Sequence, residues 1–336
     1  PGTIAVVAQG LEPFTTPLPL SVRLVQLAQA GATAAVAVET KSGRRIEYHS
    51  AGEWRSPGLS GHPLPTVATS REDGALLRVL AREGKSLHLH VESRFYTAPS
   101  ANVVGTLTGE HWPEEELVLG GHHDTVYGSP GGNDNASGTI AAIETARVLA
   151  ALRAKTGVGP GRTIRFATFS AEEQKFQGAY DFVQRHYGDG SQPRLAINLD
   201  ELSTGRMKGL VLAFPHLRAL VQAQMDTMHD GLQCHVMDQL DPSSDHFPFL
   251  RAGIDAAFLW RWRFYGRHAD AESHHERGDT SDKVHVPQRK EYVGQLARLL
   301  LRLSHIPPRD WPGNPVTAAQ VQARLDQERG TVVRVF

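Results

Sequence analysis

Six short motifs in this chain place histidine, aspartate or glutamate together, the side chains that bind divalent metal ions through nitrogen and oxygen. The chain has 17 His but one Cys, Cys234. A zinc site built on several cysteines is therefore excluded, and any metal must be held by imidazole and carboxylate groups. In chain order, the motifs are His122-His-Asp124, Asn133-Asp134-Asn, Glu172-Glu173, Asp200-Glu201, Asp245-His246 and His274-His275.

The spacing within two motifs favours specific roles. Because side chains alternate along a strand, His122 and Asp124 should point to the same side, where Asp124 can hold the ring nitrogen of His122 that does not bind metal. Glu172 and Glu173 must diverge, so one can bind metal while the other faces a water as general base. Taken alone, each motif has a simpler interpretation: a surface turn, an acidic helix start or, for Asp134, a helix N-cap.

The motifs lie at particular positions in the expected strands and helices. Between residues 94 and 306, short apolar strands alternate with helices, which predicts an α/β domain with a mostly parallel mixed sheet flanked by helices. Several motifs directly follow a strand, and ligands of such sheets bind beyond the carboxyl ends of the strands. The expected strands are residues 103–107, 117–120, 162–169, 195–199, 209–213 and 255–259, and the expected helices are 137–151, 177–185, 217–229 and 289–303.

Taken together, the strand ends of one sheet would deliver two histidines and three carboxylates, with one glutamate to spare. That supply suits two divalent ions bridged by one carboxylate. Two ions about 3.5–4 Å apart can hold and acidify a shared water while polarising a carbonyl. The sequence therefore indicates a two-metal site suited to hydrolysis.

The remaining segments show less chemistry. The net charge of -1 argues against nucleic acid or an anionic membrane as main partner, and no apolar run approaches the ~20 residues that cross a bilayer. The chain begins at Pro1, so we expect a processed or trimmed start.

A small α/β module is expected before residue 94, with strands at 3–7, 33–39 and 86–92 and helices at 21–30 and 72–82. A C-terminal extension, 307–336, should contain a helix at 318–328 and a short final strand.

The order of the motifs resembles that of the co-catalytic di-zinc exopeptidases, which include secreted bacterial and yeast aminopeptidases, plasma glutamate carboxypeptidase and glutaminyl cyclases. The shared pattern is His-x-Asp, Asn-Asp-Asn-x-Ser-Gly, Glu-Glu, a strand-end Asp and His-x-x-x-Asp-Thr, and it covers residues 97–306. Residues 1–93 resemble the protease-associated domain often inserted in this family, here N-terminally incomplete, through the segments that begin at Leu24, Ala34 and Leu64. The peptidase domain would then be residues 94–306.

The resemblance implies two Zn²⁺ per chain. One ion would be held by His122, Asp134 and Asp200. The other would be held by Asp134, Glu173 and His275, with Asp134 as the bridge. His275 is preferred over His274 because it stands four residues before Asp279, as the family pattern requires.

The resemblance also implies the catalytic roles. Glu172 would be the general base, and Asp124 would orient His122. His274 stands where some members have a Tyr that helps to stabilise the oxyanion, so it would share that role or be a simple loop residue. The implied activity is that of a zinc-dependent aminopeptidase, in which a metal-bridging water attacks the peptide bond next to a free N-terminus.

Two alternatives to an aminopeptidase stay open. The aromatic and basic run from Phe258 to Tyr265 is either a packed strand or a substrate pocket in which Arg261 or Arg263 binds a carboxylate. The second interpretation would favour a carboxypeptidase or dipeptidase. The alternative from another class is a non-catalytic binding protein that retains the fold, whereas a glutaminyl-cyclase-like transferase is less favoured because both metal sets are complete. The family implies a peptide or dipeptide substrate, a secreted or periplasmic location and a possible oligomer.

Overall fold

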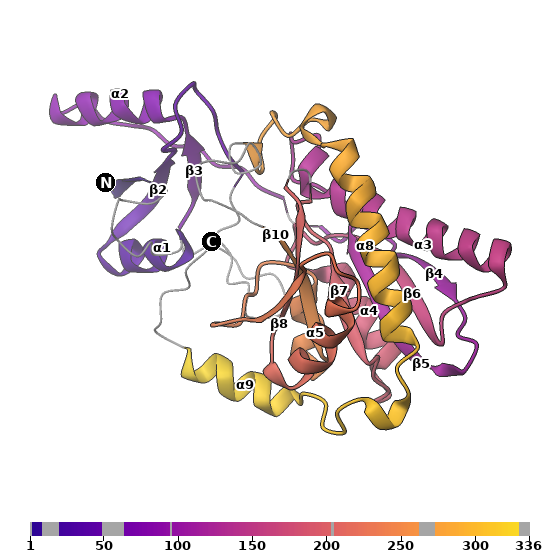
Figure 1. Ribbon diagram of the computed structural model, residues 1–336. Helices are drawn as coiled ribbons and strands as arrows, with labels where there is room; N and C mark the ends of the chain where they lie inside the picture. The colour runs from indigo at the N-terminus through magenta and orange to yellow at the C-terminus, as the bar shows by residue number, and fades with distance from the viewer. Residues whose placement is uncertain are drawn as a thin grey trace. The chain divides into compact units, whose positions relative to one another are not determined.

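The computed structural model describes residues 2–8, 20–48, 64–94, 96–202, 205–261 and 273–328. These residues divide into two compact units, one before Ser100 and one from Ser100 onward (Figure 1). Among them, no helix has both the length and the apolar character that a membrane span requires.

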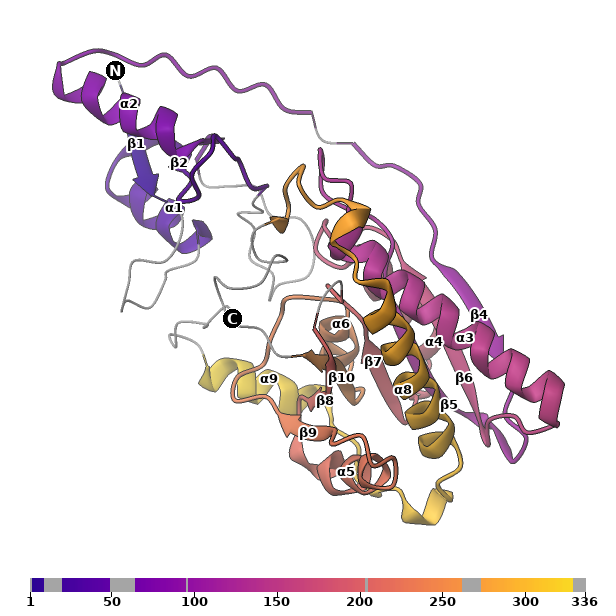
Figure 2. The same cartoon turned by 45° about the horizontal axis from the view of Figure 1, so that its top comes forward.

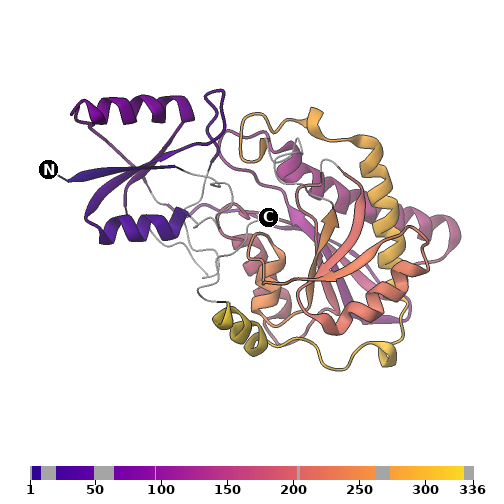
Figure 3. The ribbon, with the colours of Figure 1, turned by 60° about the vertical axis from the view of Figure 1, so that its left-hand side comes forward.

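The first unit is a small α/β layer structure. Its three strands are parallel in the order β1-β2-β3, with β1 at Thr3–Ala8, β2 at Ala32–Val38 and β3 at Thr66–Thr69. Helices α1 (Leu20–Gln29) and α2 (Arg71–Arg82) lie on opposite faces of this sheet (Figure 3). Strands β1 and β2 and both helices confirm the sequence-based expectations, while the identity of residues 1–93 as a protease-associated domain stays a prediction.

The prediction of a strand at residues 86–92 is wrong. This segment is extended but pairs with no strand of the described chain, and Leu87 and Val91 are 42% and 41% exposed. Alternation of apolar residues predicts a strand only where one face can be buried against a neighbour. Here no packing partner covers these side chains.

The second unit is built on a seven-stranded mixed sheet. The strand order is β4-β6-β5-β7-β10-β8-β9, in which β4 pairs antiparallel with β6, β10 pairs antiparallel with β8, and the other neighbours are parallel. The expectation of a mostly parallel sheet is confirmed. The strands are β4 (Val103–Leu107), β5 (Trp112–His122), β6 (Arg162–Phe169), β7 (Leu195–Asn198), β8 (Met207–Leu212), β9 (Gln233–Val236) and β10 (Ala256–Arg261).

Helices cover both faces of this sheet. Helices α3 and α8 pack together on one face, and α4 and α6 pack together on the other (Figures 1 and 2). Successive residues Leu117, Val118 and Leu119 of β5 are all buried, as a strand covered on both faces requires. The helices are α3 (Ser137–Thr156), α4 (Gln177–Tyr187), α5 (Arg218–Asp226), α6 (His246–Arg251), α8 (Val286–Ser304) and α9 (Ala318–Gln327).

Two elements of this unit were not expected from the sequence. Strand β9 is a four-residue edge strand, too short to give a clear periodic pattern. Helix α6 begins at His246 in a segment expected to be a turn because of its Ser, Asp and Pro residues. Pro248 lies in the first turn of that helix, where its missing N–H costs no helical hydrogen bond.

The described part of the C-terminal extension packs on the second unit. Arg162, the first residue of β6, is fully buried and lies between the rings of Trp112 and Trp311, 4.9 and 5.1 Å from their centroids. Its guanidinium forms an ion pair of 2.5 Å with Glu115. Further along the extension, Arg324 of α9 donates hydrogen bonds to the carbonyls of Ala213 and Met237.

We expect Arg162→Ala to lower the free energy of unfolding by about 3 kcal/mol or more, because it leaves Glu115 without one partner and two tryptophans without their contact. Urea denaturation followed by tryptophan fluorescence measures the change. Arg185→Ala, which removes the exposed ion pair with Asp181, is the matched control and should change stability far less. Equal losses in the two variants would contradict this account.

Candidate metal centre

The carboxyl ends of three neighbouring strands carry most of the predicted site residues. His122 is the last residue of β5, Glu172 and Glu173 follow β6, and Asp200 follows β7. Because these strands are adjacent and parallel in the order β6-β5-β7, their ends meet at one edge of the sheet. The structure therefore brings these side chains together, as expected for this kind of sheet.

Asp134 reaches the same place from a turn that precedes α3. Asp279 holds this turn by accepting hydrogen bonds from the backbone N–H groups of Asn133 and Asp134, at 2.7 and 2.9 Å. The turn also lies against the loop that carries His274 and His275, since a Cβ on Gly132 would be 2.5 Å from the carbonyl oxygen of Thr280. Asp134 is not a helix N-cap: the cap residue of α3 is Ala136, so that simpler interpretation is wrong.

Two uncharged residues of the same motif fasten the turn to the segment after β7. Asn135 donates to the carbonyl of Leu199 at 2.9 Å and accepts from the backbone N–H of Glu201 at 3.2 Å. Ser137 accepts from the N–H of Leu202 at 2.6 Å. The sequence analysis assigned no role to Asn135, Ser137 or Asp279. Their positions in the Asn-Asp-Asn-x-Ser-Gly and His-x-x-x-Asp-Thr patterns were the feature that could have indicated one.

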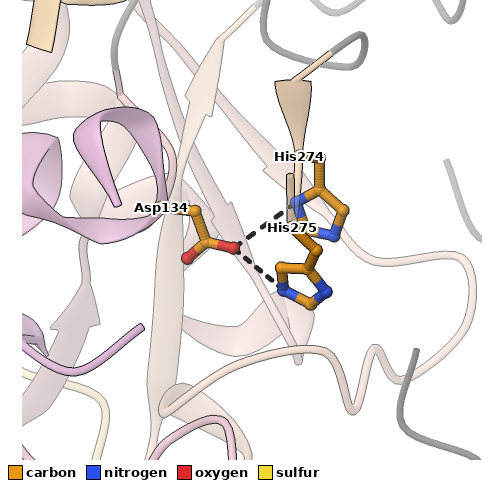
Figure 4. A group of neighbouring side chains, drawn as sticks. All are labelled: Asp134, His274 and His275. Atoms are coloured by element: carbon orange, nitrogen blue, oxygen red, sulfur yellow. Dashed lines mark ion pairs between the residues drawn. The ribbon is translucent and has the colours of Figure 1, made fainter. Parts of the chain in front are cut away.

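The carboxylate of Asp134 stands between two groups of side chains. Its Oδ1 is 3.1 Å from Nε2 of His122, which is also 3.4 Å from Oδ1 of Asp200. Its Oδ2 is 3.1 Å from Nε2 of His275, which is also 3.3 Å from Oε2 of Glu173. Figure 4 shows the carboxylate of Asp134 facing the imidazoles of His274 and His275. His122 and His275 thus each face one oxygen of Asp134 and one further carboxylate.

These spacings fit the donor atoms of zinc. With bonds of about 2.0–2.1 Å, two ligand atoms of a tetrahedral zinc lie about 3.3 Å apart, close to the four distances between donor atoms. In the described chain, buried Nε2 of His122, Oε1 of Glu173 and Oδ1 of Asp200 have no hydrogen-bond partner. Buried polar atoms of this kind need an explanation, and a bound metal ion provides one.

Glu172 lies in the same cluster at a longer distance. Three groups of side chains have ligand atoms close enough together to share an ion: His122 with Glu172 and Asp200, His122 with Asp134 and Glu173, and Asp134 with His274 and His275. In the first group, Oε2 of Glu172 is 3.9 Å from Nε2 of His122. The distance exceeds the spacing of two ligands on one zinc, so the geometry favours a group that faces a water over a ligand.

Asp124 lies beside His122, as expected, but it contacts more groups than the ring of His122 alone. Nδ1 of His122 is 3.1 Å from the backbone carbonyl of Asp124 and 3.5 Å from its carboxylate. That carboxylate also accepts the backbone N–H groups of Glu172 and Glu173, at 3.1 and 3.3 Å. Asp124 therefore fixes both the imidazole of His122 and the backbone that carries the two glutamates.

His274 is held by a residue that the sequence reasoning did not single out. Its Nδ1 is 3.0 Å from Oε1 of Glu201, which also accepts from the side chain of Asn133 at 2.9 Å. The ring stacks on His275 with centroids 3.8 Å apart. Nδ1 is also 3.4 Å from Asp134, so His274 lies within reach of the metal-binding atoms, but its bond to Glu201 is the shorter one.

Burial and charge shift the pKa values of the central groups. Burial alone would lower the pKa of His122, but the charges of Glu172 and Asp200 raise it well above its usual value. Burial alone would also lower the pKa of His275, but the bonds of this histidine to Asp134 and Glu173 raise that pKa to about 12. For Glu172, burial raises the pKa well above that of an ordinary glutamate.

The chain is similar to known proteins in sequence and in fold. Residues 102–299, more than half of the chain, match the model of peptidase family M28. The chain belongs to peptidase family M28. The M28 assignment confirms the resemblance to the co-catalytic zinc exopeptidases, whereas the family model does not cover residues 1–93.

Similar M28 proteins include both aminopeptidases and carboxypeptidases. The chain is 32% identical to aminopeptidase YwaD of Bacillus subtilis, over 61% of this chain and 45% of that protein. It is 25% identical to carboxypeptidase Q of Mus musculus, over 76% of this chain and 53% of that protein. The chain thus spans about half the length of these curated relatives.

Solved structures show the same fold. The zinc aminopeptidase BSAP from Bacillus subtilis superposes with a TM-score of 0.64 at 20% identity, over 94% of this chain and 72% of that chain. This similarity supports the α/β fold class. The run from Phe258 to Tyr265, expected to be either a strand or a pocket, ends outside the described residues, which include the β10 backbone only to Arg261.

We predict that zinc binding to the metal-free protein releases about two protons near pH 7, because His122 and His275 must lose a proton before they can bind a metal. Since both pKa values are raised, the apparent affinity for zinc should increase with pH from 6 to 9. Calorimetric titration in buffers of different ionisation enthalpy measures the released protons.

The exposed neighbour His123 provides a control for this experiment. His123→Ala should release as many protons as the unmodified protein, while His275→Ala should release about one fewer and bind zinc more weakly. A binding enthalpy that does not depend on the buffer would contradict the assignment of the histidines as ligands.

Proposed function

We propose that this chain acts as a zinc exopeptidase that removes N-terminal residues from peptides. The observation that carries the proposal is the position of Asp134, whose two oxygens face His122 and His275, while each of these histidines also faces a further carboxylate at the spacing of zinc ligands. His122, Asp134 and Asp200 would hold one Zn²⁺, and Asp134, Glu173 and His275 the other. When bound, two such ions polarise a carbonyl and acidify a water.

Glu172 is the proposed general base. It is 4% exposed and adjacent to both proposed ligand sets, yet it is farther from His122 than the ligands are. Its raised pKa brings the carboxyl closer to neutral pH, where a group can both accept and return a proton. Glu172 would take the proton of the attacking water and deliver it to the leaving amine.

The proposed role of His274 is to bind the oxyanion. Nδ1 of the ring faces Glu201. Burial opposes protonation of His274, but the charge of Glu201 raises its pKa, and a protonated ring would have Nε2–H left to donate to the oxyanion. A hydrogen bond aimed at the developing negative charge stabilises the transition state more than the substrate. Asp124 would act through His122 and through the backbone of the two glutamates, as a positioning residue.

An N-terminal amine is a cation, and this property favours an aminopeptidase. The carboxylates of Asp200 and Glu201 are partly exposed, at 21% and 12% of their side chains, and lie at the rim of the cluster. A carboxypeptidase or dipeptidase would need a cationic group for the substrate carboxylate, and similarity to carboxypeptidase Q keeps this second candidate in view.

Family membership supports further parts of the proposal. We propose that residues 1–93 are a protease-associated domain, that residues 94–306 are the peptidase domain, and that residues 307–336 are a C-terminal extension. A secreted or periplasmic location and a possible oligomer belong to the same proposal.

Glu172→Gln should keep both zinc ions and lower kcat by about 10²–10⁴, the usual contribution of a general base. Glu173→Gln has the same chemical change one residue away and should instead lose bound zinc, because it removes a proposed ligand. Metal content and kcat are measured on both variants. Full activity of Glu172→Gln would exclude it as the base.

Substrate preference tests the activity itself. We expect hydrolysis of aminoacyl anilides with a free N-terminus and little hydrolysis of N-acylated dipeptides, both assayed with the zinc-loaded protein. Cleavage of the blocked substrates alone would favour the carboxypeptidase. If neither is cleaved and bound zinc stays well below one equivalent after zinc is added, the chain is a non-catalytic protein of this fold.

A further inference from the structure

A small cavity lies between strands β5, β6 and β7 and helix α6. Its volume is about 10 Å³, close to the minimum that holds one water molecule. Most of its wall is apolar, but three polar side chains line it: Asn198, Asp245 and His246.

These three side chains have polar atoms without partners. They are 3%, 0% and 1% exposed, so bulk water cannot solvate them. In the described chain, Oδ1 of Asn198, both carboxylate oxygens of Asp245 and Nδ1 of His246 are buried and have no hydrogen-bond partner. Leaving such a group unsatisfied costs about 1–3 kcal/mol, so three together in one cavity indicate a missing hydrogen-bonding partner.

The neighbouring contacts identify these atoms as acceptors. Nδ2 of Asn198 donates to Oγ of Ser244 at 2.6 Å, which directs Oδ1 away from that bond. Nε2 of His246 is 2.8 Å from the carbonyl of Asp241. Since a carbonyl only accepts, Nε2 carries the hydrogen, and Nδ1 of the neutral ring is an acceptor. Asn198 and His246 therefore need a donor between them.

We propose that one water molecule occupies this cavity and bridges Oδ1 of Asn198, Nδ1 of His246 and the carboxyl group of Asp245. A water donates two hydrogen bonds, which matches the two neutral acceptors. Burial lowers the pKa of His246 and raises that of Asp245, and the carboxyl group of Asp245 is the third partner of the water. The water thereby gives a partner to Asn198, His246 and one oxygen of Asp245.

The water has a consequence for Asp200, and this last step rests on the proposed metal site. By accepting from the water, Oδ1 of Asn198 keeps Nδ2 turned toward Ser244. Ser244 then donates its one hydrogen to Oδ2 of Asp200 at 2.6 Å, which leaves Oδ1 of Asp200 to face His122 at 3.4 Å. Asn198 and the water are therefore positioning elements that select the oxygen of Asp200 available to a metal.

High-resolution crystallography of the full chain tests the water without reference to activity or zinc. We expect an ordered water 2.6–3.2 Å from Oδ1 of Asn198, Nδ1 of His246 and an oxygen of Asp245, with and without added zinc. A dry cavity in which Asp245 bonds directly to Asn198 or His246 would overturn the proposal. An anomalous signal at this position after soaking in rubidium chloride would also overturn it, by showing a cation site.

Zinc affinity tests the positioning role. Asn198→Leu, which keeps the size of the side chain, should raise the zinc dissociation constant about 10–100-fold, as loss of a residue that orients a ligand does. Ser244→Ala interrupts the same series of hydrogen bonds with a smaller change of side chain. It should also raise the zinc dissociation constant. Gln295→Leu removes another buried amide, in α8, and is the control.

The two parts of the result can be separated. Equal zinc dissociation constants for Gln295→Leu, Asn198→Leu and Ser244→Ala would overturn the positioning role. If the unmodified protein bound no zinc but held the water, the proposed function would fail while the water site would stand.

Discussion

The concentration of buried carboxylates at one sheet edge is the constraint on which the rest of this structure depends. Asp134, Glu172 and Glu173 are at most 6% exposed and lie close together, and like charges in a region of low dielectric repel strongly. Such a cluster is stable only with positive charge between its members. Three histidines, His122, His274 and His275, lie within 3.4 Å of Asp134, and divalent metal ions would supply the positive charge.

Much of the surrounding chain holds this cluster in place through backbone contacts. Asp279 accepts from the turn that carries Asp134, Asp124 accepts from the segment that carries the two glutamates, and Asn135 ties the turn to the end of β7. Each of these side chains acts on the N–H or C=O groups of a neighbouring segment. A rigid frame of this kind lets side chains from five segments meet in one cluster, as a site for a pair of metal ions requires.

The sequence was sufficient to predict the sheet, because β5, β6 and β7 are apolar runs that end in polar residues. It also brought together His122, Asp134, Glu173, Asp200 and His275, because a family pattern records their order. It did not indicate Glu201 beside His274, or the cavity lined by Asn198, Asp245 and His246. Those contacts depend on side chains of α6 and of loops, whose positions follow from tertiary packing and leave no periodic pattern.

The central claim is that Asp134 bridges two metal ions. Anomalous diffraction at the zinc absorption edge, from crystals loaded with zinc, tests it most directly. The account predicts two peaks about 3.5–4 Å apart, one beside each oxygen of Asp134, with His122 next to one and His275 next to the other. A single peak, or two peaks that do not share Asp134, would contradict it.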